Sequence, residues 1–159
     1  MRTRIVAVRH AEPESGSGYA DMDLCPLSER GKATHAQTSQ HLKKHGLVPT
    51  LIYCSPILRA VQTAEIMSEV FAVPYKQEPL LGDAFNASAL LGLMPQPGED
   101  QTVILVGHAP TLTAFIHKLI GEEAVPEGIC MSGSVIVDFI EPPEFGKGRF
   151  VRYYQPIHP

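Results

Sequence analysis

The sequence has little cysteine, no run of basic residues and no long hydrophobic segment. Its three cysteines, Cys25, Cys54 and Cys130, form no CxxC pair, so we expect reduced thiols rather than a zinc site or a disulfide framework. No phosphate-cradling loop follows any of them, which disfavours a cysteine nucleophile. A formal net charge of -4 without a basic run disfavours nucleic-acid binding.

Nothing in the chain predicts insertion into a membrane or export. No apolar run approaches the ~18 residues that a spanning helix needs. Only about four apolar residues precede Arg9, which is too few for a signal peptide. We therefore expect a cytoplasmic protein without a membrane partner.

The length and composition predict one globular domain. The chain has 159 residues, of which 44% are hydrophobic and 19% are charged, and this length suffices for one sizeable core. No internal repeat or low-complexity segment divides it. We assign residues 1–159 to a single domain.

Strand and helix patterns alternate along most of the chain. Short β-branched runs predict buried strands, and Ser28, Gly46 and Ser55-Pro56 are typical of helix boundaries. The expected strands are 4–8, 51–54, 74–79, 103–107, 134–140 and 149–154, and the expected helices are 29–44, 56–71, 84–93 and 110–120. This order predicts an α/β three-layer sandwich with a mixed, mainly parallel sheet and an antiparallel edge hairpin near the carboxyl terminus.

Two arginines and two histidines follow three of these strands. Arg9 and His10 end the first strand, Arg59 lies early in the helix after the second, and His108 follows the fourth. The carboxyl ends of parallel strands share one edge of the sheet, where helix amino termini also point. We therefore expect these four side chains to converge.

This set of residues suits phosphoryl chemistry. Guanidinium groups and helix-end N–H groups stabilise the oxygens of a phosphoryl dianion. A neutral imidazole can attack phosphorus, hold the phosphoryl group through an N–P bond and release it to water. A second imidazole, protonated beside the bound anion, would stabilise charge on the equatorial oxygens. The sequence thus predicts a phosphate site with a histidine nucleophile.

The other histidines show no comparable pattern. His35, His41 and His45 lie along one helix at spacings of six and four residues, and we interpret them as part of a solvated helix face. Metal binding by His41 and His45 is the alternative, but no acidic third ligand is near them in the sequence. His117 and His158 carry no signal. We expect no metal and no cofactor.

Four segments resemble the motifs of one family. Residues 9–12, Arg-His-Ala-Glu, resemble the Arg-His-Gly signature of the histidine phosphatase superfamily, which has the phosphoglycerate-mutase-like fold. Residues 26–31 resemble its Leu-Thr/Ser-x-x-Gly motif, and residues 106–108 match its late Gly/Ser-His segment. Residues 55–64 match its Ser-Pro-x-x-Arg-Ala-x-Gln-Thr-Ala segment almost completely, which is the most specific of the four similarities.

The resemblance implies a role for each residue of the expected pocket. It implies that His10 is the phospho-accepting nucleophile. Arg9, Arg59 and His108 would form the rest of the catalytic phosphate pocket and bind the substrate. No metal takes part in the reaction that the resemblance implies.

The resemblance also implies a substrate class. In size and motifs the chain is similar to SixA-type phosphohistidine phosphatases, because the mutases of the family are considerably longer. We expect the partner to be a phosphohistidine-bearing protein, or alternatively a small phosphate ester such as a sugar phosphate. Mutase activity and a non-catalytic phosphate-binding module are less favoured. The loop 11–27 and the segment 82–100 would shape substrate entry, and we expect a monomer or weak homodimer.

Two positions depart from the family pattern. Ala11 replaces the usual glycine and adds a methyl group beside the pocket. Many members supply a carboxylic acid after the third strand to protonate the leaving group, and here Asp83 is the first candidate and Glu78 the second. Asp83 could instead cap a helix that begins at Ala84. Phosphohistidine needs no such acid, because a protonated imidazole departs readily.

Overall fold

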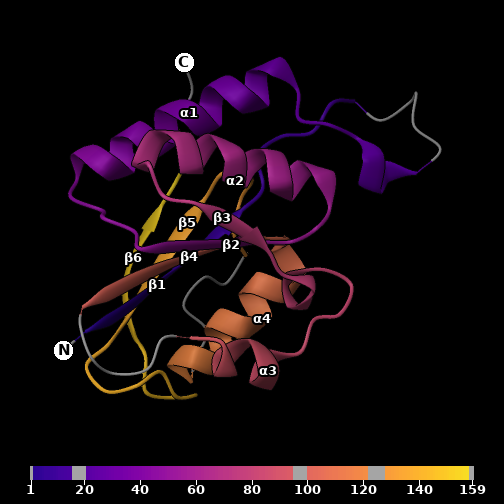
Figure 1. Ribbon diagram of the computed structural model, residues 1–159. Helices are drawn as coiled ribbons and strands as arrows, with labels where there is room; N and C mark the ends of the chain where they lie inside the picture. Colours follow the sequence, from indigo (N-terminus) through magenta and orange to yellow (C-terminus); the bar gives the residue numbers. More distant parts are fainter. Residues whose placement is uncertain (1, 16–20, 95–99, 122–127, 158–159) are drawn as a thin grey trace.

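A six-stranded sheet forms the middle layer of the protein (Figure 1). The computed structural model describes residues 2–15, 21–94, 100–121 and 128–157. The order of the strands across the sheet is β3-β2-β4-β1-β5-β6. The strands are β1 (Thr3–Arg9), β2 (Leu51–Cys54), β3 (Tyr75–Gln77), β4 (Gln101–Gly107), β5 (Ser134–Phe139) and β6 (Arg149–Tyr154).

Helices cover both faces of this sheet (Figure 1). On one face lie α1 (Glu29–Lys44) and α2 (Leu58–Phe71), and on the other lie α3 (Ala87–Gly92) and α4 (Ala109–Ile120). β1, β2, β3 and β4 run parallel, whereas β5 pairs antiparallel with β1 and with β6. The expected three-layer sandwich with its antiparallel hairpin is confirmed. Within the described ranges, no helix combines the length and hydropathy that a membrane crossing requires.

Alternate side chains of β1 pack against opposite helix layers. Ile5 belongs to a buried apolar cluster with Phe115 of α4, whereas Val6 belongs to a second cluster with Met67 of α2. Successive side chains of a strand point to opposite faces, so a strand covered on both sides has to be apolar throughout. This requirement accounts for the uninterrupted apolar run before Arg9.

Helix α1 begins where the sequence predicts. Ser28 is its N-cap, and Gly31 N donates a hydrogen bond to Ser28 Oγ at 2.9 Å. A Cβ atom added to Gly31 would overlap the backbone carbonyl oxygen of Glu12. The glycine therefore lets α1 pack directly on the segment that leaves β1.

Helix α2 begins two residues later than expected. Its first residue is Leu58 rather than Pro56, and its N-cap residue makes no side-chain capping bond. Ser55 Oγ instead accepts a hydrogen bond from Ile57 N at 3.2 Å. This serine closes a turn between β2 and α2, a local bond that competes with helix initiation.

Helix α3 also begins later than expected, at Ala87 instead of Ala84. Asn86 is the N-cap residue, and its Oδ1 accepts a hydrogen bond from Ala89 N at 2.9 Å. The alternative in which Asp83 caps this helix is therefore wrong. An asparagine closer to the helix supplies the capping oxygen.

Candidate active site

Three parallel strands end at the same edge of the sheet. β1 and β4 end in register, and β2 ends one residue earlier. The residues that follow these strands are His10, Ser55 and His108. His10 N donates to the Gly107 carbonyl oxygen at 3.0 Å, so the pairing of β1 with β4 continues one residue further and fixes the backbone at His10.

His10 is buried at this edge, with 6% of its surface exposed. Its Nδ1 atom lies 2.7 Å from the Ala11 carbonyl oxygen. Because a carbonyl oxygen only accepts hydrogen bonds, Nδ1 carries the proton and Nε2 carries the lone pair. Burial is the main cause that lowers the pKa of His10 to about 4, and the neighbouring positive side chains act in the same direction. The ring is therefore neutral at neutral pH.

His108 faces His10 at the edge of the sheet. The two ring centroids are 5.3 Å apart, and the ring planes are inclined by 55°. Burial lowers the pKa of His108 and Arg59 lowers it further, while the charges of Asp23 and Asp83 raise it. His108 is thus a weaker base than a solvated histidine while no anion is bound.

Two hydroxyl groups from the segment around the start of α2 support the site. Ser55 Oγ and His108 Nε2 are hydrogen-bonded at 2.9 Å. Thr63 Oγ1 donates to the Arg59 carbonyl oxygen at 2.7 Å and accepts from Ala11 N at 3.0 Å. Thr63 therefore links the turn of α2 that carries Arg59 to the chain leaving β1.

Arg9 is anchored at one end of its guanidinium group. Nη1 donates to the Ile129 carbonyl oxygen at 3.0 Å. The Nε atom of Arg9 is buried and has no hydrogen-bond partner among the described residues. A buried donor without a partner is costly to the folded state.

Ala11 fits the site without requiring a glycine. The residue is completely buried. Among the described non-glycine residues, positive φ angles occur at Ala72 and Ser132 and not at Ala11. The backbone conformation at this position therefore does not require a glycine, and the methyl group of Ala11 is buried.

The two acids considered from the sequence have different surroundings. Glu78 Oε2 accepts a hydrogen bond from Leu80 N at 2.9 Å and caps the 3₁₀ helix η3 (Pro79–Leu81). Asp83 is exposed, and its charge acts on His108. Glu78 therefore caps η3, and Asp83 remains the candidate for the acid that protonates the leaving group.

A third acid near the pocket was missed by the sequence analysis. The 3₁₀ helix η2 (Met22–Leu24) lies within the loop 11–27. Asp23 Oδ1 lies 3.6 Å from Arg59 Nη1. No periodicity or motif marks Asp23, because the loop that carries it is irregular and its partner comes from α2.

The prediction that His35 lies on a solvated helix face is wrong. His35 is completely buried, and its Nδ1 atom is hydrogen-bonded to Ser132 Oγ at 3.0 Å. Ser132 N in turn donates to the carbonyl oxygens of Arg9 and His10 at 3.1 and 3.2 Å. The missed signal is helical periodicity, since His35 precedes the buried Leu42 by two turns.

His41 and His45 lie at the carboxyl-terminal end of α1. The ring centroids of His41 and His45 are 4.2 Å apart, and those of both lie near Tyr154, at 6.0 and 6.2 Å. In the part of the chain that the structure describes, no group of three or more His, Cys, Asp or Glu side chains is placed to hold a metal ion.

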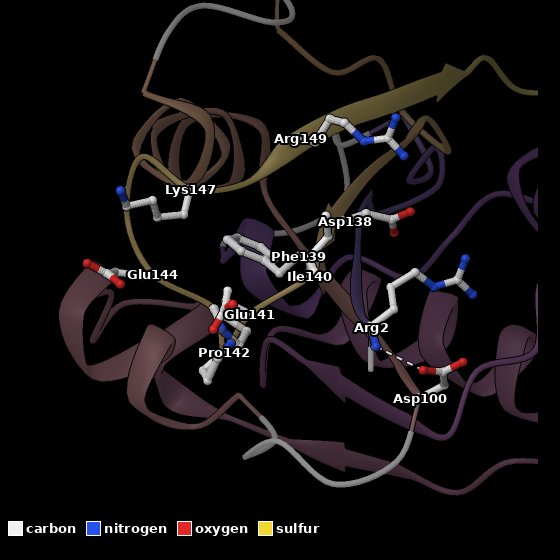
Figure 2. Close-up of a pocket in the computed structure, with 11 residues that line it drawn as sticks. Arg2, Asp100, Asp138, Phe139, Ile140, Glu141, Pro142, Glu144, Lys147 and Arg149 are labelled. Carbon is white, nitrogen blue, oxygen red and sulfur yellow. Dashed lines mark hydrogen bonds between the residues drawn. The ribbon is translucent and has the colours of Figure 1, made fainter.

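A surface pocket of about 820 Å³ lies at the opposite end of the sheet (Figure 2). Phe139 and Ile140 form part of its lining, and Arg2 N donates to Asp100 Oδ1 at 2.8 Å on one side. Arg2 and Asp100 precede β1 and β4, whereas His10 follows β1. This pocket is therefore separate from the site formed by Arg9, His10, Arg59 and His108.

Solved structures with the same fold include phosphatases. A candidate phosphohistidine phosphatase SixA from Agrobacterium tumefaciens is 25% identical, with a TM-score of 0.80 over 96% of this chain and 98% of that chain. The protein histidine phosphatase SixA in complex with tungstate is 19% identical, with a TM-score of 0.77 over 94% and 95%. A mycobacterial glucosyl-3-phosphoglycerate phosphatase is 17% identical, with a TM-score of 0.65 over 94% and 97%. The last two similarities establish the shared fold alone.

Sequence comparison establishes the family. An uncharacterised protein of Picosynechococcus sp. is 32% identical over 107 residues, which span 65% of this chain and 65%, just under two thirds, of that relative. The sequence profile of the histidine phosphatase superfamily (branch 1) matches residues 5–88. The matched region exceeds half of the chain and includes Arg9, His10 and Arg59. The chain therefore belongs to the histidine phosphatase superfamily.

Proposed function

We propose that this phosphatase removes the phosphoryl group from phosphohistidine in a protein, without a metal ion, through a covalent intermediate on His10. Membership of the histidine phosphatase superfamily supports a phosphatase activity. The observation that carries the mechanism is the state of His10, whose Nδ1 atom is engaged by the Ala11 carbonyl oxygen. The ring is thereby held with its Nε2 lone pair available for attack.

The first chemical step transfers the phosphoryl group to the enzyme. His10 Nε2 forms an N–P bond while the bond between phosphorus and the leaving group breaks and its electron pair departs with that group. In the second step water attacks phosphorus, inorganic phosphate leaves, and Nε2 regains its lone pair. Dividing hydrolysis into two displacements gives each step a lower barrier than direct attack by water.

The charge of the phosphoryl group is met by protein cations. The guanidinium groups of Arg9 and Arg59 would bind the equatorial oxygens. His108 would take up a proton when the dianion binds, because a nearby negative charge raises the pKa of an imidazole. Ser55 holds His108 in place for this role through the 2.9 Å hydrogen bond.

Phosphohistidine fits this site because of its leaving group. An imidazole that is protonated on its far nitrogen leaves as a neutral ring and needs no proton from the enzyme. Glu78, one of the two expected acids, is engaged in capping η3, and a substrate with an easy leaving group tolerates that loss. The similarity to the Agrobacterium SixA structure, over nearly the full length of both chains at 25% identity, supports the same substrate class.

A small phosphate ester is the second candidate substrate. Its alkoxide leaving group needs a proton from a general acid, and Asp83 is exposed with its charge acting on His108. The fold is shared with a mycobacterial phosphatase of a phosphorylated sugar derivative. Proton donation by Asp83 to the leaving group would favour a small phosphate ester as the substrate.

Replacing the nucleophile tests the mechanism. His10→Ala should abolish turnover of 4-nitrophenyl phosphate and the formation of a base-stable, acid-labile phosphoenzyme, because it removes the Nε2 lone pair that is proposed to attack phosphorus. His45→Ala is the matched control, since that histidine is exposed at the end of α1. Turnover by His10→Ala at the wild-type rate would refute the assignment.

A substrate panel tests the substrate class. Peptides phosphorylated on histidine by phosphoramidate should be hydrolysed with a higher kcat/KM than sugar phosphates or nucleotide monophosphates. The reverse order would favour the small-ester phosphatase. A phosphate-binding module without catalysis would retain phosphate but give neither turnover nor phosphoenzyme.

A further inference from the structure

The loop after β1 places a carboxylate beside Arg59, one of the residues expected to bind phosphate. Asp23 Oδ1 lies 3.6 Å from Arg59 Nη1, and the same Nη1 donates to the Met22 carbonyl oxygen at 3.3 Å. The side chain of Arg59 is 21% exposed and that of Asp23 is 49% exposed. One nitrogen of Arg59 is thus held by the loop, and Asp23 remains open to solvent beside the site.

The turn that carries Asp23 is closed by its own hydrogen bonds. Asp21 Oδ1 accepts from Asp23 N at 2.9 Å, and the Asp21 carbonyl oxygen accepts from Leu24 N at 3.1 Å. Cys25 N donates to the Met22 carbonyl oxygen at 3.1 Å, and Cys25 is buried. These bonds fix the position of the Asp23 backbone, from which its carboxylate reaches to 3.6 Å from Arg59 Nη1.

A partly exposed ion pair of this kind contributes little to folding stability. The role of Asp23 is therefore inferred from the effect of its charge on His108. The charge of Asp23 acts on His108 more strongly than that of Asp83, and both favour the protonated ring. An anionic group therefore lies within range of the place where the dianionic phosphoryl group is expected to bind.

A carboxylate in this position acts differently on different substrates. It repels every phosphoryl dianion, so by itself it weakens binding. A leaving group that brings positive charge offsets this repulsion, whereas a leaving group with its own carboxylate or phosphate adds to it. Charge complementarity of this kind determines selectivity between substrates of similar size.

Protonated phosphohistidine has the complementary charge. As His10 Nε2 forms its bond to phosphorus, the N–P bond of the substrate breaks and the electron pair stays on the substrate nitrogen. The proton on the other ring nitrogen stays in place, so a cationic ring departs as neutral imidazole. A nearby carboxylate stabilises the protonated form that leaves readily.

We propose that Asp23 is a specificity residue, which favours phosphoryl substrates with a cationic nitrogen leaving group and disfavours phosphate esters with an additional anionic group. The assignment rests on the proposed function, because it supposes that phosphoryl groups bind between Arg59 and His108. It adds a physical basis for the choice among phosphorylated compounds and assigns that choice to the loop after β1.

The test compares three substrates in four proteins. The substrates are a histidine-phosphorylated peptide, 4-nitrophenyl phosphate and 3-phosphoglycerate, whose leaving groups are cationic, without additional charge and anionic. The proteins are wild type, Asp23→Asn, Asp23→Glu and the control Asp100→Asn, which makes the same chemical change before β4 at the opposite end of the sheet.

Asp23→Asn should lower kcat/KM for the phosphopeptide about tenfold relative to 4-nitrophenyl phosphate, which corresponds to about 1.4 kcal/mol. It should raise kcat/KM for 3-phosphoglycerate relative to 4-nitrophenyl phosphate. Asp23→Glu should keep the wild-type order because it keeps the charge, and Asp100→Asn should change no ratio. The ratio changes should shrink with added salt.

Equal changes on all three substrates would mean that Asp23 only positions Arg59, and they would overturn the proposal. Failure of the proposed function gives a different result, in which the wild type does not hydrolyse the phosphopeptide. The ratio of 3-phosphoglycerate to 4-nitrophenyl phosphate remains measurable in that case. If Asp23→Asn leaves this ratio unchanged, Asp23 plays no part in specificity.

Discussion

Acidification from pH about 7 to about 4.5 should leave about three quarters of His10 neutral, whereas a solvated imidazole takes up a proton near pH 6.5. Burial lowers the pKa of His10 to about 4 from an ordinary value of 6.5. The hydrogen bond to the Ala11 carbonyl oxygen acts against this shift, but burial outweighs it. The nucleophile should therefore stay competent well into the acid range.

The size of the effect follows from the shift. A difference of about 2.5 units corresponds to about 3 kcal/mol of preference for the neutral ring. At pH about 5.5, about 97% of His10 is neutral if its pKa is near 4, compared with about 9% at the ordinary value. Burial of this side chain thus preserves roughly tenfold more nucleophile at that pH.

Nitrogen-resolved NMR of the histidine rings measures this directly. A titration from pH about 3.5 to about 8, with His10→Asn to assign the signal, should show a midpoint near 4 and a proton on Nδ1 at neutral pH. A midpoint near 6.5 would refute the burial argument. A neutral ring with its proton on Nε2 would refute the assignment of the attacking atom.

Four further results are expected. Asp83→Asn should slow hydrolysis of an alkyl phosphate at least about tenfold and that of phosphohistidine much less, and equal slowing would remove Asp83 as the general acid. Gly31→Ala should lower the free energy of unfolding in urea by about 2 kcal/mol, because its methyl group overlaps the Glu12 carbonyl; Gly92→Ala, with open space around it, should not. Lowering the pH below 6.5 should destabilise the fold, since burial lowers the pKa of His35 to about 3 and that of His10 to about 4, and the unfolded chain binds both protons more tightly. His35→Gln should flatten this pH dependence, and an unchanged slope would contradict the argument. A chelator should leave phosphatase activity intact, and a loss of activity that added metal restores would contradict the metal-independent mechanism.

Local sequence signals predicted the elements that local chemistry controls. The N-cap at Ser28 is confirmed, because a serine oxygen placed just before the helix satisfies an amide that has no other partner. Ser55 and Pro56 carry the same kind of signal, yet the helix begins at Leu58. The oxygen of Ser55 is bonded to Ile57 N and His108 Nε2 instead, and the second of these partners is distant in the sequence.

The candidate site also combines features that the local sequence predicts with features that depend on distant contacts. Arg9 ends β1, His10 and His108 follow β1 and β4, and Arg59 lies in the first turn of α2, the helix after β2. The rule that parallel strands share one carboxyl edge predicts that these places lie together. The contributions of Ser132 and Asp23 depend on contacts across the fold, with His35 and Arg59 respectively. No pattern in the sequence reports contacts of that kind.

By itself the sequence determined the order of strands and helices, the family and the four residues expected at the phosphate site, because periodicity, capping and motifs are local properties of the chain. Only the tertiary structure decided which nitrogen of His10 carries the lone pair, that Glu78 is engaged in capping, that His35 is buried and that Asp23 lies beside Arg59. Burial, tautomer and charge environment depend on which distant segments come into contact, and packing across the sheet edge sets those contacts.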